Sequence, residues 1–422
     1  MKKDFLLEKF FEQERWEKAL DIGCDKSIDK GLLRALTQPE TRLYIFNKIV
    51  NGEYEIAPPK QVAIPKDNGE YRIVYVNEGL DRIVLSIINS LLFEFCHELI
   101  HSNCKSYQTG IGCGKIVQQA TKEIEKVKSD DIGVKLDLTK YFDSVAIEYI
   151  DNIFDKVEEI VGKSKVIDIC RKYYHADECY DTDGNLVLKY QSLKQGCAVA
   201  SFLANAVLYN IDLKVSNLSD IFYVRYSDDL LIIGNHWEEG FNIVKKDLGE
   251  MRLSLNPKKV EYLSRDKWFK FLGFRIKGSS ITISKNRVKD FQKNIEECTI
   301  RNKDISYKRA LNRVNRYLYK GDGQYSWATS VLPIINVSKD ITALNGFVMD
   351  SLRACQTNKK RIGGLGSADN LSDRTIMRGT GRNVKSNREK TEKRLKGYYT
   401  LNCMRNALLT RRAVYDTLVR SL

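Results

Sequence analysis

The spacing of apolar positions predicts helices at both ends of the chain and strands between them. Residues 1–55, Asp81–Ser102 and Lys285–Lys320 repeat apolar side chains at helical spacing. Short β-branched runs bounded by turn residues predict strands. The expected strands are Gln61–Pro65, Tyr71–Val76, Ile132–Leu138, Ile221–Tyr226, Leu230–Ile233, Phe271–Ile276 and Ser280–Ile283. Strands interleaved with helices indicate an α+β fold.

The composition is that of a globular protein whose positive charge is unevenly distributed. Of the 422 residues, 43% are hydrophobic and 29% are charged, which excludes a fibrous or wholly disordered chain. The net charge is +14, but residues 281–422 alone carry 29 basic and 12 acidic residues, and residues 1–280 carry a net −3. This asymmetry favours nucleic acid as a partner, and a solvated basic surface is the alternative.

The cysteines and histidines indicate a cytoplasmic protein without a zinc site. The ten cysteines include no CxxC pair and the first residues do not form a signal peptide, so we expect reduced thiols. The longest apolar run, Ile83–Phe95, is interrupted by polar residues and is too short to span a membrane. His97 and His101 lie one helical turn apart without further ligands at zinc spacing. Gly110–Lys115 lacks the spacing of a P-loop and predicts an ordinary turn.

Three acidic residues stand at strand ends and point to a metal site. Asp228 and Asp229 are adjacent in a predicted turn between two strands, where their mutual repulsion favours a bound cation. Asp137 comes at the end of another apolar strand, so neighbouring strands can direct all three carboxylates at one site. Hard carboxylate oxygens select Mg²⁺, and such a site suits two-metal phosphoryl transfer. Asp130 and Asp131 form a second acidic pair, which we interpret as a solvated turn.

Six segments between about residue 60 and residue 283 resemble, in the same order, the motifs of reverse transcriptases. They are Ile64-Pro65-Lys66 with Arg72 and Leu80–Val84, Val134–Phe142, Gln195-Gly196 with Leu203-Ala204-Asn205, Tyr226-Ser227-Asp228-Asp229, Leu253–Lys259, and Phe271–Phe274. The resemblance implies a right-hand polymerase fold of fingers and palm with a helical thumb and a basic, mainly helical C-terminal region. The implied domains are an N-terminal helical region (1–55), fingers and palm (56–283), the thumb (284–320) and a basic RNA-binding region (321–422).

The resemblance assigns catalytic roles to the acidic residues. Asp137 and Asp228 are expected to bridge two Mg²⁺ ions, for which Mn²⁺ is an alternative, and the Leu138 carbonyl is expected to add a ligand. Asp229 is expected to support the metal on the primer side, with a turn-forming role as the alternative. Lys259 is expected to donate a proton to pyrophosphate, unless it is only a surface charge.

Nucleotide binding is expected at five further positions of the resemblance. Lys66 and Arg72 lie on the predicted fingertip hairpin, where a triphosphate would arrive; a solvated turn is the alternative. Phe142 would clash with a 2′-hydroxyl and so select dNTPs, or else it is a plain core residue. Gln195 and Gly196 would let the backbone lie close to the nascent base pair.

The remaining expectations concern the nucleic acid. Leu272 and Gly273 resemble the primer grip of the family. The run Asp373–Lys396 holds nine Lys and Arg against three acids, so its arginines are expected to bind RNA phosphates and the tyrosines behind it to stack on bases; a solvated tail is the alternative. These RNA-binding candidates are Arg374, Arg378, Arg382, Arg388, Tyr398 and Tyr399.

The implied function is RNA-directed DNA synthesis from dNTPs, with an RNA template, a DNA product and no membrane partner. Ala200-Ser201 stands where bacterial relatives usually have Ser-Pro, and no Cys/His endonuclease module or retron-type Val-Thr-Gly thumb motif is recognisable. The remaining resemblance is to stand-alone, defence-associated bacterial reverse transcriptases of the unknown-group and abortive-infection lineages, some of which copy a companion noncoding RNA. Template-independent DNA synthesis and a maturase-like RNA-binding role are the alternatives, and the oligomeric state is not predicted.

Overall fold

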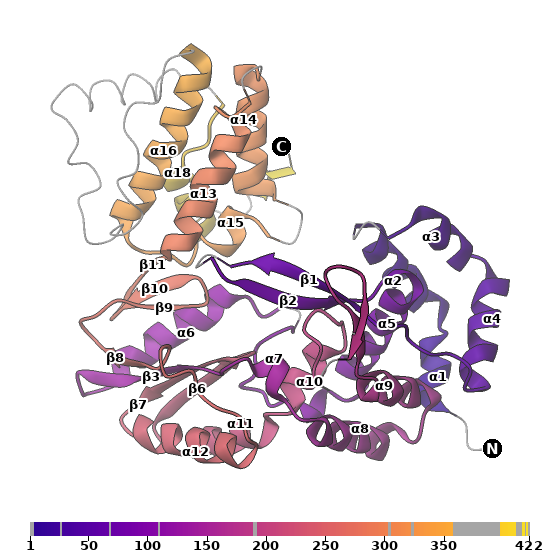
Figure 1. The fold of residues 1–422 in the computed structure, drawn as a ribbon. Coiled ribbons are helices and arrows are strands. Elements are labelled where there is room, and N and C mark those ends of the chain that lie inside the picture. Colours follow the sequence, from indigo (N-terminus) through magenta and orange to yellow (C-terminus); the bar gives the residue numbers. More distant parts are fainter. Residues whose placement is uncertain are drawn as a thin grey trace, which may run out of the picture. The chain divides into compact units, whose positions relative to one another are not determined.

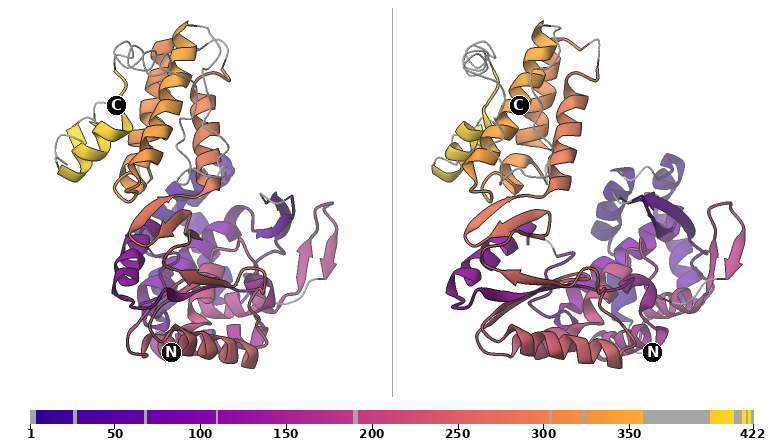
Figure 2. Two further views of the ribbon diagram at one scale, coloured as in Figure 1. Left: turned by 90° about the vertical axis from the view of Figure 1, so that its left-hand side faces the viewer. Right: turned by 60° about the vertical axis from the view of Figure 1, so that its left-hand side comes forward.

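The computed structural model forms two compact units of mixed helix and sheet (Figure 1, Figure 2). It describes residues 4–25, 28–66, 69–108, 110–188, 192–302, 305–321, 325–357, 397–410, 416–417 and 419–420. The first unit comprises Met1–Thr109, Gly133–Ile232 and His236–Tyr262. The second comprises Gly110–Ile132, Ile233–Asn235 and Leu263–Leu422.

The helices of the first unit share one hydrophobic core. They are α1 (Phe5–Phe10), α2 (Gln13–Asp25), α3 (Lys30–Leu36), α4 (Pro39–Val50), α5 (Gly79–Phe95), the 3₁₀ helix η1 (His97–Leu99), α7 (Tyr141–Ser144), α8 (Ile147–Val161), α9 (Lys165–His175), α10 (Ala200–Ala206), α11 (Tyr209–Ser216) and α12 (Trp237–Glu250). The helical prediction for residues 1–55 is confirmed by α1–α4, which contribute Phe10, Trp16 and Ile49 to that core.

The predicted helix Asp81–Ser102 is wrong at its C-terminal end, because α5 stops at Phe95. The chain leaves the helix so that Asn103–Lys105 can run beside β6 (Ile221–Tyr226), where the Arg225 backbone N–H donates to the Asn103 carbonyl at 2.9 Å. The Lys105 N–H returns a bond to the Arg225 carbonyl at 2.8 Å. Hydrogen bonding to a distant strand therefore overrides the local helical pattern.

The described residues form three sheets. The first has the order β2 (Tyr71–Val76), β1 (Lys60–Pro65), β4 (Glu178–Tyr180), β5 (Leu186–Leu188); the second has the order β6, β7 (Asp229–Gly234), β3 (Asp131–Asp137), β8 (Glu261–Ser264); the third has the order β11 (Ser280–Ile283), β10 (Phe274–Lys277), β9 (Phe269–Phe271). Six of the seven predicted strands are confirmed within a residue or two. The apolar side chains of Ile132, Val134 and Leu136 stand at every second position and are buried, which explains why β3 was predictable.

The predicted strand Phe271–Ile276 is wrong, because a turn at Leu272 and Gly273 divides it into β9 and β10. Both residues have positive φ, 48° for Leu272 and 79° for Gly273, which no extended strand allows. The sequence does not indicate this turn, because the apolar side chains on either side of it form the pattern expected of one continuous strand.

The second unit is mainly helical beyond its sheet. Its helices are α6 (Cys113–Lys126), α13 (Lys285–Cys298), α14 (Tyr307–Asn315), the short π-helix η2 (Arg316–Lys320), α15 (Trp327–Ser330), α16 (Ser338–Thr357) and α18 (Leu401–Thr410). The helical pattern predicted for Lys285–Lys320 is confirmed. The turn predicted for Gly110–Lys115 is wrong in its second half, because α6 begins at Cys113 and its buried positions Ile116, Val117 and Ala120 continue at helical spacing from there. Gly114 packs against Ile334, whose Cγ1 lies 2.5 Å from where a Cβ would stand. The four predicted domain boundaries remain predictions.

Candidate active site

Two chain segments bring Asp137 and Asp228 side by side. Asp137 is the last residue of β3, and Asp228 lies in the turn between β6 and β7. The Leu138 N–H donates to the Asp228 carbonyl at 3.1 Å, which ties the end of β3 to this turn. Asp229 begins β7, and Asp137 is only 7% exposed. The sequence therefore folds so that three predicted acids stand at one end of the same sheet.

Two lysines compensate the charge of these acids. Lys259 Nζ lies 2.9 and 2.8 Å from the two carboxylate oxygens of Asp137. Lys135, on the same strand as Asp137, places its Nζ 4.0 Å from Asp229 Oδ1. The Lys259 side chain is 55% exposed and that of Lys135 is 16% exposed, so Lys259 is the one with room to move.

Burial and mutual repulsion raise the pKa values of two of the acids. Burial raises the pKa of Asp228, and the nearby charge of Asp137 raises it further. Burial also raises the pKa of Asp229 to about 6, with Asp228 and Asp137 acting in the same direction and Lys135 opposing them. Oxygen ligands that repel one another fit a hard divalent cation in chemistry and charge. In the part of the chain that the structure describes, no three His, Cys, Asp or Glu side chains already converge on a metal position.

The residues predicted to bind nucleotide lie on several elements of the first unit. Phe142, on α7, is partly buried against the core and contacts the Tyr141 ring edge to face, with centroids 5.7 Å apart. The Gln195 carbonyl accepts the Tyr75 N–H at 2.6 Å, and Gly196 has a φ of 108°. The backbone of the Gln195-Gly196 segment therefore lies directly against β2.

The two fingertip cations differ in their surroundings. Arg72 stands opposite Ile64 in the β1–β2 hairpin, and its charge lowers the pKa of Asp228, so it lies within electrostatic range of the acids. Lys66 Nζ lies 3.5 Å from Glu70 Oε2, and its side chain is 40% exposed. Their roles in binding a triphosphate remain predictions.

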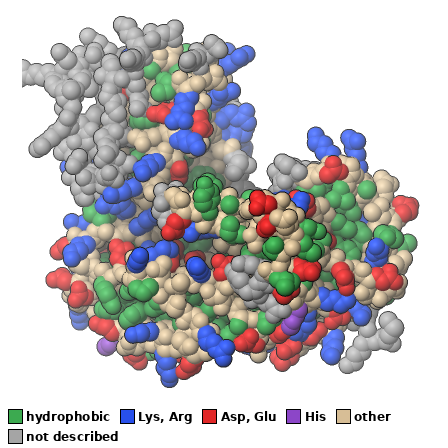
Figure 3. Space-filling view, viewed as in Figure 1, with side chains coloured by type: hydrophobic (Ala, Val, Ile, Leu, Met, Phe, Trp, Pro, Cys, Tyr) green, Lys and Arg blue, Asp and Glu red, His purple; other side chains and the backbone are tan. Residues whose placement is uncertain are grey.

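The predicted primer-grip and RNA-binding residues belong to the second unit. Leu272 and Gly273 form the β9–β10 turn. Arg374, Arg378, Arg382 and Arg388 lie outside the described residues. Tyr398 and Tyr399 are half-buried; the Tyr398 hydroxyl donates to Asn345 Oδ1 at 2.9 Å, and the Tyr399 carbonyl accepts from the Tyr319 hydroxyl. Figure 3 shows Lys and Arg side chains in blue over much of the face drawn. The exposed cations of α13 and α14 are Lys285, Lys289, Lys293, Lys308, Arg309 and Arg313.

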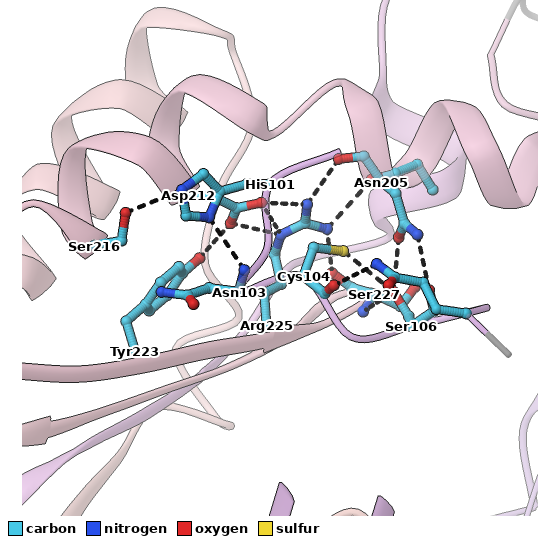
Figure 4. A network of polar contacts seen from close by, with 12 residues as sticks. His101, Asn103, Cys104, Ser106, Asn205, Asp212, Ser216, Tyr223, Arg225 and Ser227 are labelled. Carbon is cyan, nitrogen blue, oxygen red and sulfur yellow. Dashed lines mark hydrogen bonds and ion pairs between the residues drawn. The ribbon is translucent and has the colours of Figure 1, made fainter. Parts of the chain in front are cut away.

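Sequence reasoning missed a buried polar network behind the acidic turn (Figure 4). Its centre is Arg225, which is 0% exposed and paired with Asp212, also 0% exposed. Ser106 and Asn205 join it, and the Tyr107 hydroxyl lies 3.5 Å from Ser227 Oγ. The available signal was a charged residue in the otherwise apolar strand Ile221–Tyr226, because a buried charge demands a partner.

Comparison with known proteins agrees with this geometry. The family model described as "Reverse transcriptase (RNA-dependent DNA polymerase)" matches residues 64–276, half of the chain. The putative COX1/OXI3 intron 1 protein of Saccharomyces cerevisiae is 23% identical over 167 residues, which are 39% of this chain. The match spans only 19% of the length of that relative.

Solved telomerase structures are among the structural matches. Candida albicans telomerase in complex with a fragment of telomeric RNA matches with a TM-score of 0.42 and 12% identity, over 80% of this chain and 64% of that chain. Apo telomerase from Candida tropicalis matches with a TM-score of 0.44 and 10% identity, over 86% of this chain and 69% of that chain. None of the helices that the structure describes has the length and apolar character needed to cross a membrane. With Asp137 and Asp228 joined at the end of β3 and the family model spanning both, the chain belongs to the reverse transcriptase (RNA-dependent DNA polymerase) family.

Proposed function

We propose that the chain is an RNA-directed DNA polymerase that uses Asp137, Asp228 and Asp229 for phosphoryl transfer. The observation that carries this proposal is the 3.1 Å bond from the Leu138 N–H to the Asp228 carbonyl, which sets two carboxylates from different segments beside each other. Membership of the reverse transcriptase family gives that arrangement its chemical meaning. Binding of RNA alone requires no such convergence of acids.

The acids are proposed to hold two divalent cations, Mg²⁺ or Mn²⁺. When bound, these cations supply positive charge at the attacking 3′-hydroxyl and at the phosphate oxygens. Asp137, Asp228 and the Leu138 carbonyl would hold them, and Asp229 would support the one on the primer side. Lys259, which is 55% exposed, would then leave Asp137 and donate a proton to the departing pyrophosphate.

The other residues are proposed to position and select the nucleotide. Phe142 excludes the 2′-hydroxyl of a ribonucleotide by its bulk. Gln195 and Gly196 hold the backbone against the nascent base pair, supported by the 2.6 Å bond from Tyr75 N–H to the Gln195 carbonyl. Lys66 and Arg72 neutralise the triphosphate from the fingertip hairpin.

Primer extension on an RNA template tests the catalytic proposal. The double variant Asp228→Ala, Asp229→Ala should retain its fold and lose extension in Mg²⁺ and in Mn²⁺, because the ligands are gone. Asp130→Ala, Asp131→Ala is the matched control, since it removes two adjacent carboxylates that are exposed. Equal extension by the two double variants would disprove the assignment. Extension by the parent without added RNA would favour template-independent synthesis.

The second unit is proposed to hold the RNA through its basic residues and through Leu272 and Gly273 at the primer. The exposed cations on α13 and α14 and the excess of basic residues in 281–422 support this proposal. Replacing Arg374, Arg378, Arg382 and Arg388 together by Gln should weaken RNA binding and lower the slope of log affinity against log salt by about 0.7 to 0.9 per lost phosphate contact. An unchanged slope would contradict the role of these arginines.

The biological role is proposed to be defence of a bacterial cell against phage, with a structured noncoding RNA as the template. The resemblance to defence-associated lineages and the Ala200-Ser201 departure support it. Phage plating on cells that express the parent or the Asp228→Ala, Asp229→Ala variant tests it, and protection should require the acids. Equal plaque counts would contradict it. Sequencing of the nucleic acid that co-purifies with the parent would identify the template; a bound RNA without any complementary DNA would favour the maturase-like alternative.

A further inference from the structure

The Arg225 side chain is fully buried and uses all of its hydrogen-bond donors. Nε donates to Asp212 Oδ1 at 2.8 Å, and Nη2 donates to Asp212 Oδ2 at 2.6 Å and to the Asn205 carbonyl at 2.8 Å. Nη1 donates to the Ala204 carbonyl at 3.3 Å and to the Ser227 carbonyl at 3.2 Å. An arginine has five N–H groups, so none is left over. The guanidinium therefore joins α11, the end of α10 and the turn Ser227-Asp228 between β6 and β7, called the catalytic turn below, in one fixed arrangement.

Ser227, the residue before Asp228, is held at both of its backbone polar groups. Its N–H donates to Ser106 Oγ at 2.9 Å, and its carbonyl accepts from Arg225. Its φ is 61°, in the left-handed region that residues other than glycine rarely adopt. Such a conformation is strained and persists where surrounding contacts impose it. Side chains of other segments therefore fix the direction in which the chain enters Asp228.

The Ser106 hydroxyl connects this turn to α10. It donates to Asn205 Oδ1 at 2.7 Å while it accepts the Ser227 N–H, and Asn205 Nδ2 donates back to the Ser106 carbonyl at 2.8 Å. Ser106 and Asn205 are both 0% exposed. Figure 4 draws the pair beside Ser227, with Arg225 next to it. Besides the Cys104 Sγ at 3.5 Å in its own segment, the Ser106 hydroxyl thus has partners in two distant segments.

The same network reaches the segment that follows Asp137. The Tyr141 hydroxyl donates to the Ala204 carbonyl at 2.8 Å, and this is the carbonyl that Arg225 also contacts. Tyr141 is 2% exposed and immediately precedes Phe142. One set of buried hydrogen bonds therefore links the catalytic turn, the end of α10 and Tyr141. Tyr141 is the neighbour of Phe142, the residue proposed to exclude ribonucleotides.

We propose that Ser106, Asn205 and Arg225 are positioning residues that hold Ser227 in its left-handed conformation and so aim Asp228 at the reacting phosphate. All three side chains are 0% exposed, so they act on the reaction only through the turn. The predicted effect on synthesis rests on the proposed polymerase function. The effect on the turn does not, because it concerns a hydrogen bond of the protein alone.

Ser106→Ala tests the proposal, with Ser201→Ala as the matched control. Ser201 is also a serine whose hydroxyl donates to an asparagine, Asn89 Oδ1 at 3.1 Å, but its partners Asn89 and Ala198 both lie outside the turn at Ser227 and Asp228. Hydrogen exchange of the Ser227 amide, measured in overlapping peptides, should become at least about tenfold faster in Ser106→Ala, because its acceptor is lost. It should stay at the parent rate in Ser201→Ala.

Kinetics give the second readout. Ser106→Ala should lower kcat about 10- to 100-fold with a nearly unchanged KM for dNTP, because misplacement of a catalytic group by about 1 Å has effects of that size. Ser106→Thr, which keeps the hydroxyl, should recover most of kcat, and Asn205→Ala should reproduce the loss. A melting temperature close to that of the parent shows that the variants fold.

Two results would overturn the proposal: an unchanged exchange rate of the Ser227 amide in Ser106→Ala, or a loss of kcat no larger than that of Ser201→Ala. A parent protein that fails to extend a primer would refute the polymerase function instead. In that case the exchange measurement still decides whether Ser106 holds the turn.

Discussion

Gly196→Ala is predicted to damage the proposed nucleotide site through one close backbone contact. A Cβ at position 196 would lie 2.8 Å from the Tyr75 carbonyl oxygen and 3.2 Å from the Tyr75 nitrogen. These are backbone atoms of β2, and the Tyr75 N–H is bonded to the Gln195 carbonyl at 2.6 Å, so they cannot move aside without breaking that bond. The φ of 108° adds a conformational cost, because side chains other than hydrogen clash there.

The magnitude follows from two separate costs. A positive φ costs a residue with a Cβ about 1–2 kcal/mol, and forcing an extra methyl into a packed site costs about 1–3 kcal/mol. We therefore expect Gly196→Ala to destabilise the first unit by about 2–5 kcal/mol, which for a unit of about 240 residues lowers Tm by roughly 4–20 °C. The displaced Gln195 backbone should also raise the KM for dNTP.

Gly52→Ala isolates the conformational cost. Gly52 has a φ of 74°, follows α4 in the same unit, and has nothing within 4 Å of the position of a Cβ. Thermal unfolding followed by circular dichroism, with primer extension at varied dNTP concentration, compares the two variants. Equal losses of Tm, or an unchanged KM for dNTP in Gly196→Ala, would refute the reasoning from the Tyr75 contact.

Three further predictions address the active site directly. Phe142→Ala should incorporate ribonucleotides that the parent excludes, because the smaller side chain leaves room for the 2′-hydroxyl. Equal incorporation of rNTPs by both proteins in primer extension would show that another residue selects the sugar. Because burial and neighbouring acids raise the pKa of Asp229 to about 6, the metal-free fold holds a proton there that the unfolded chain has already released. The stabilisation of the fold by this proton is therefore largest below the ordinary pKa of an aspartate and is lost as the pH rises to about 6. Because Mg²⁺ competes with the proton for Asp229, the increase in Tm on adding Mg²⁺ should be larger at pH 7 than at pH 5. Equal increases in Tm at the two pH values would contradict this. Lys259→Met should lower kcat, because the side chain proposed to give a proton to the departing pyrophosphate is gone, and a kcat equal to that of the parent would exclude it as the proton donor.

The sequence predicted the sheet of the active site because its strands carry strong local signals. Ile132, Val134 and Leu136 alternate with Gly133 and Lys135, and the first three are fully buried. Asp137 follows this run directly, so an acid at the strand end was visible without any tertiary information. The paired acids after β6 gave the second half of the site in the same way.

The parts that could not be predicted depend on contacts between distant segments. The end of α5 is set by the pairing of Asn103 and Lys105 with Arg225, more than a hundred residues later. No local pattern distinguishes Ser106 from other serines, because its role depends on the hydrogen bond that its hydroxyl accepts from the Ser227 N–H. The turn at Leu272 was not predicted because the apolar residues Phe271 and Phe274 on either side of it continue the pattern of a single strand. Local patterns thus locate the acids but not the side chains that orient them.

The two lysines of the site show how a cluster of acids can fold before any cation binds. Lys135 and Asp137 are two residues apart on β3 and so lie on one face of the strand, which brings Lys135 within 4.0 Å of Asp229 across the sheet. That lysine is largely buried and belongs to the framework of the sheet. Lys259, by contrast, comes from the segment after α12 and is half exposed, although it bonds both oxygens of Asp137. Lys135 is therefore suited to remain as a fixed counter-charge, and Lys259 is the one whose exposure leaves it room to part from Asp137, as the proposed mechanism requires.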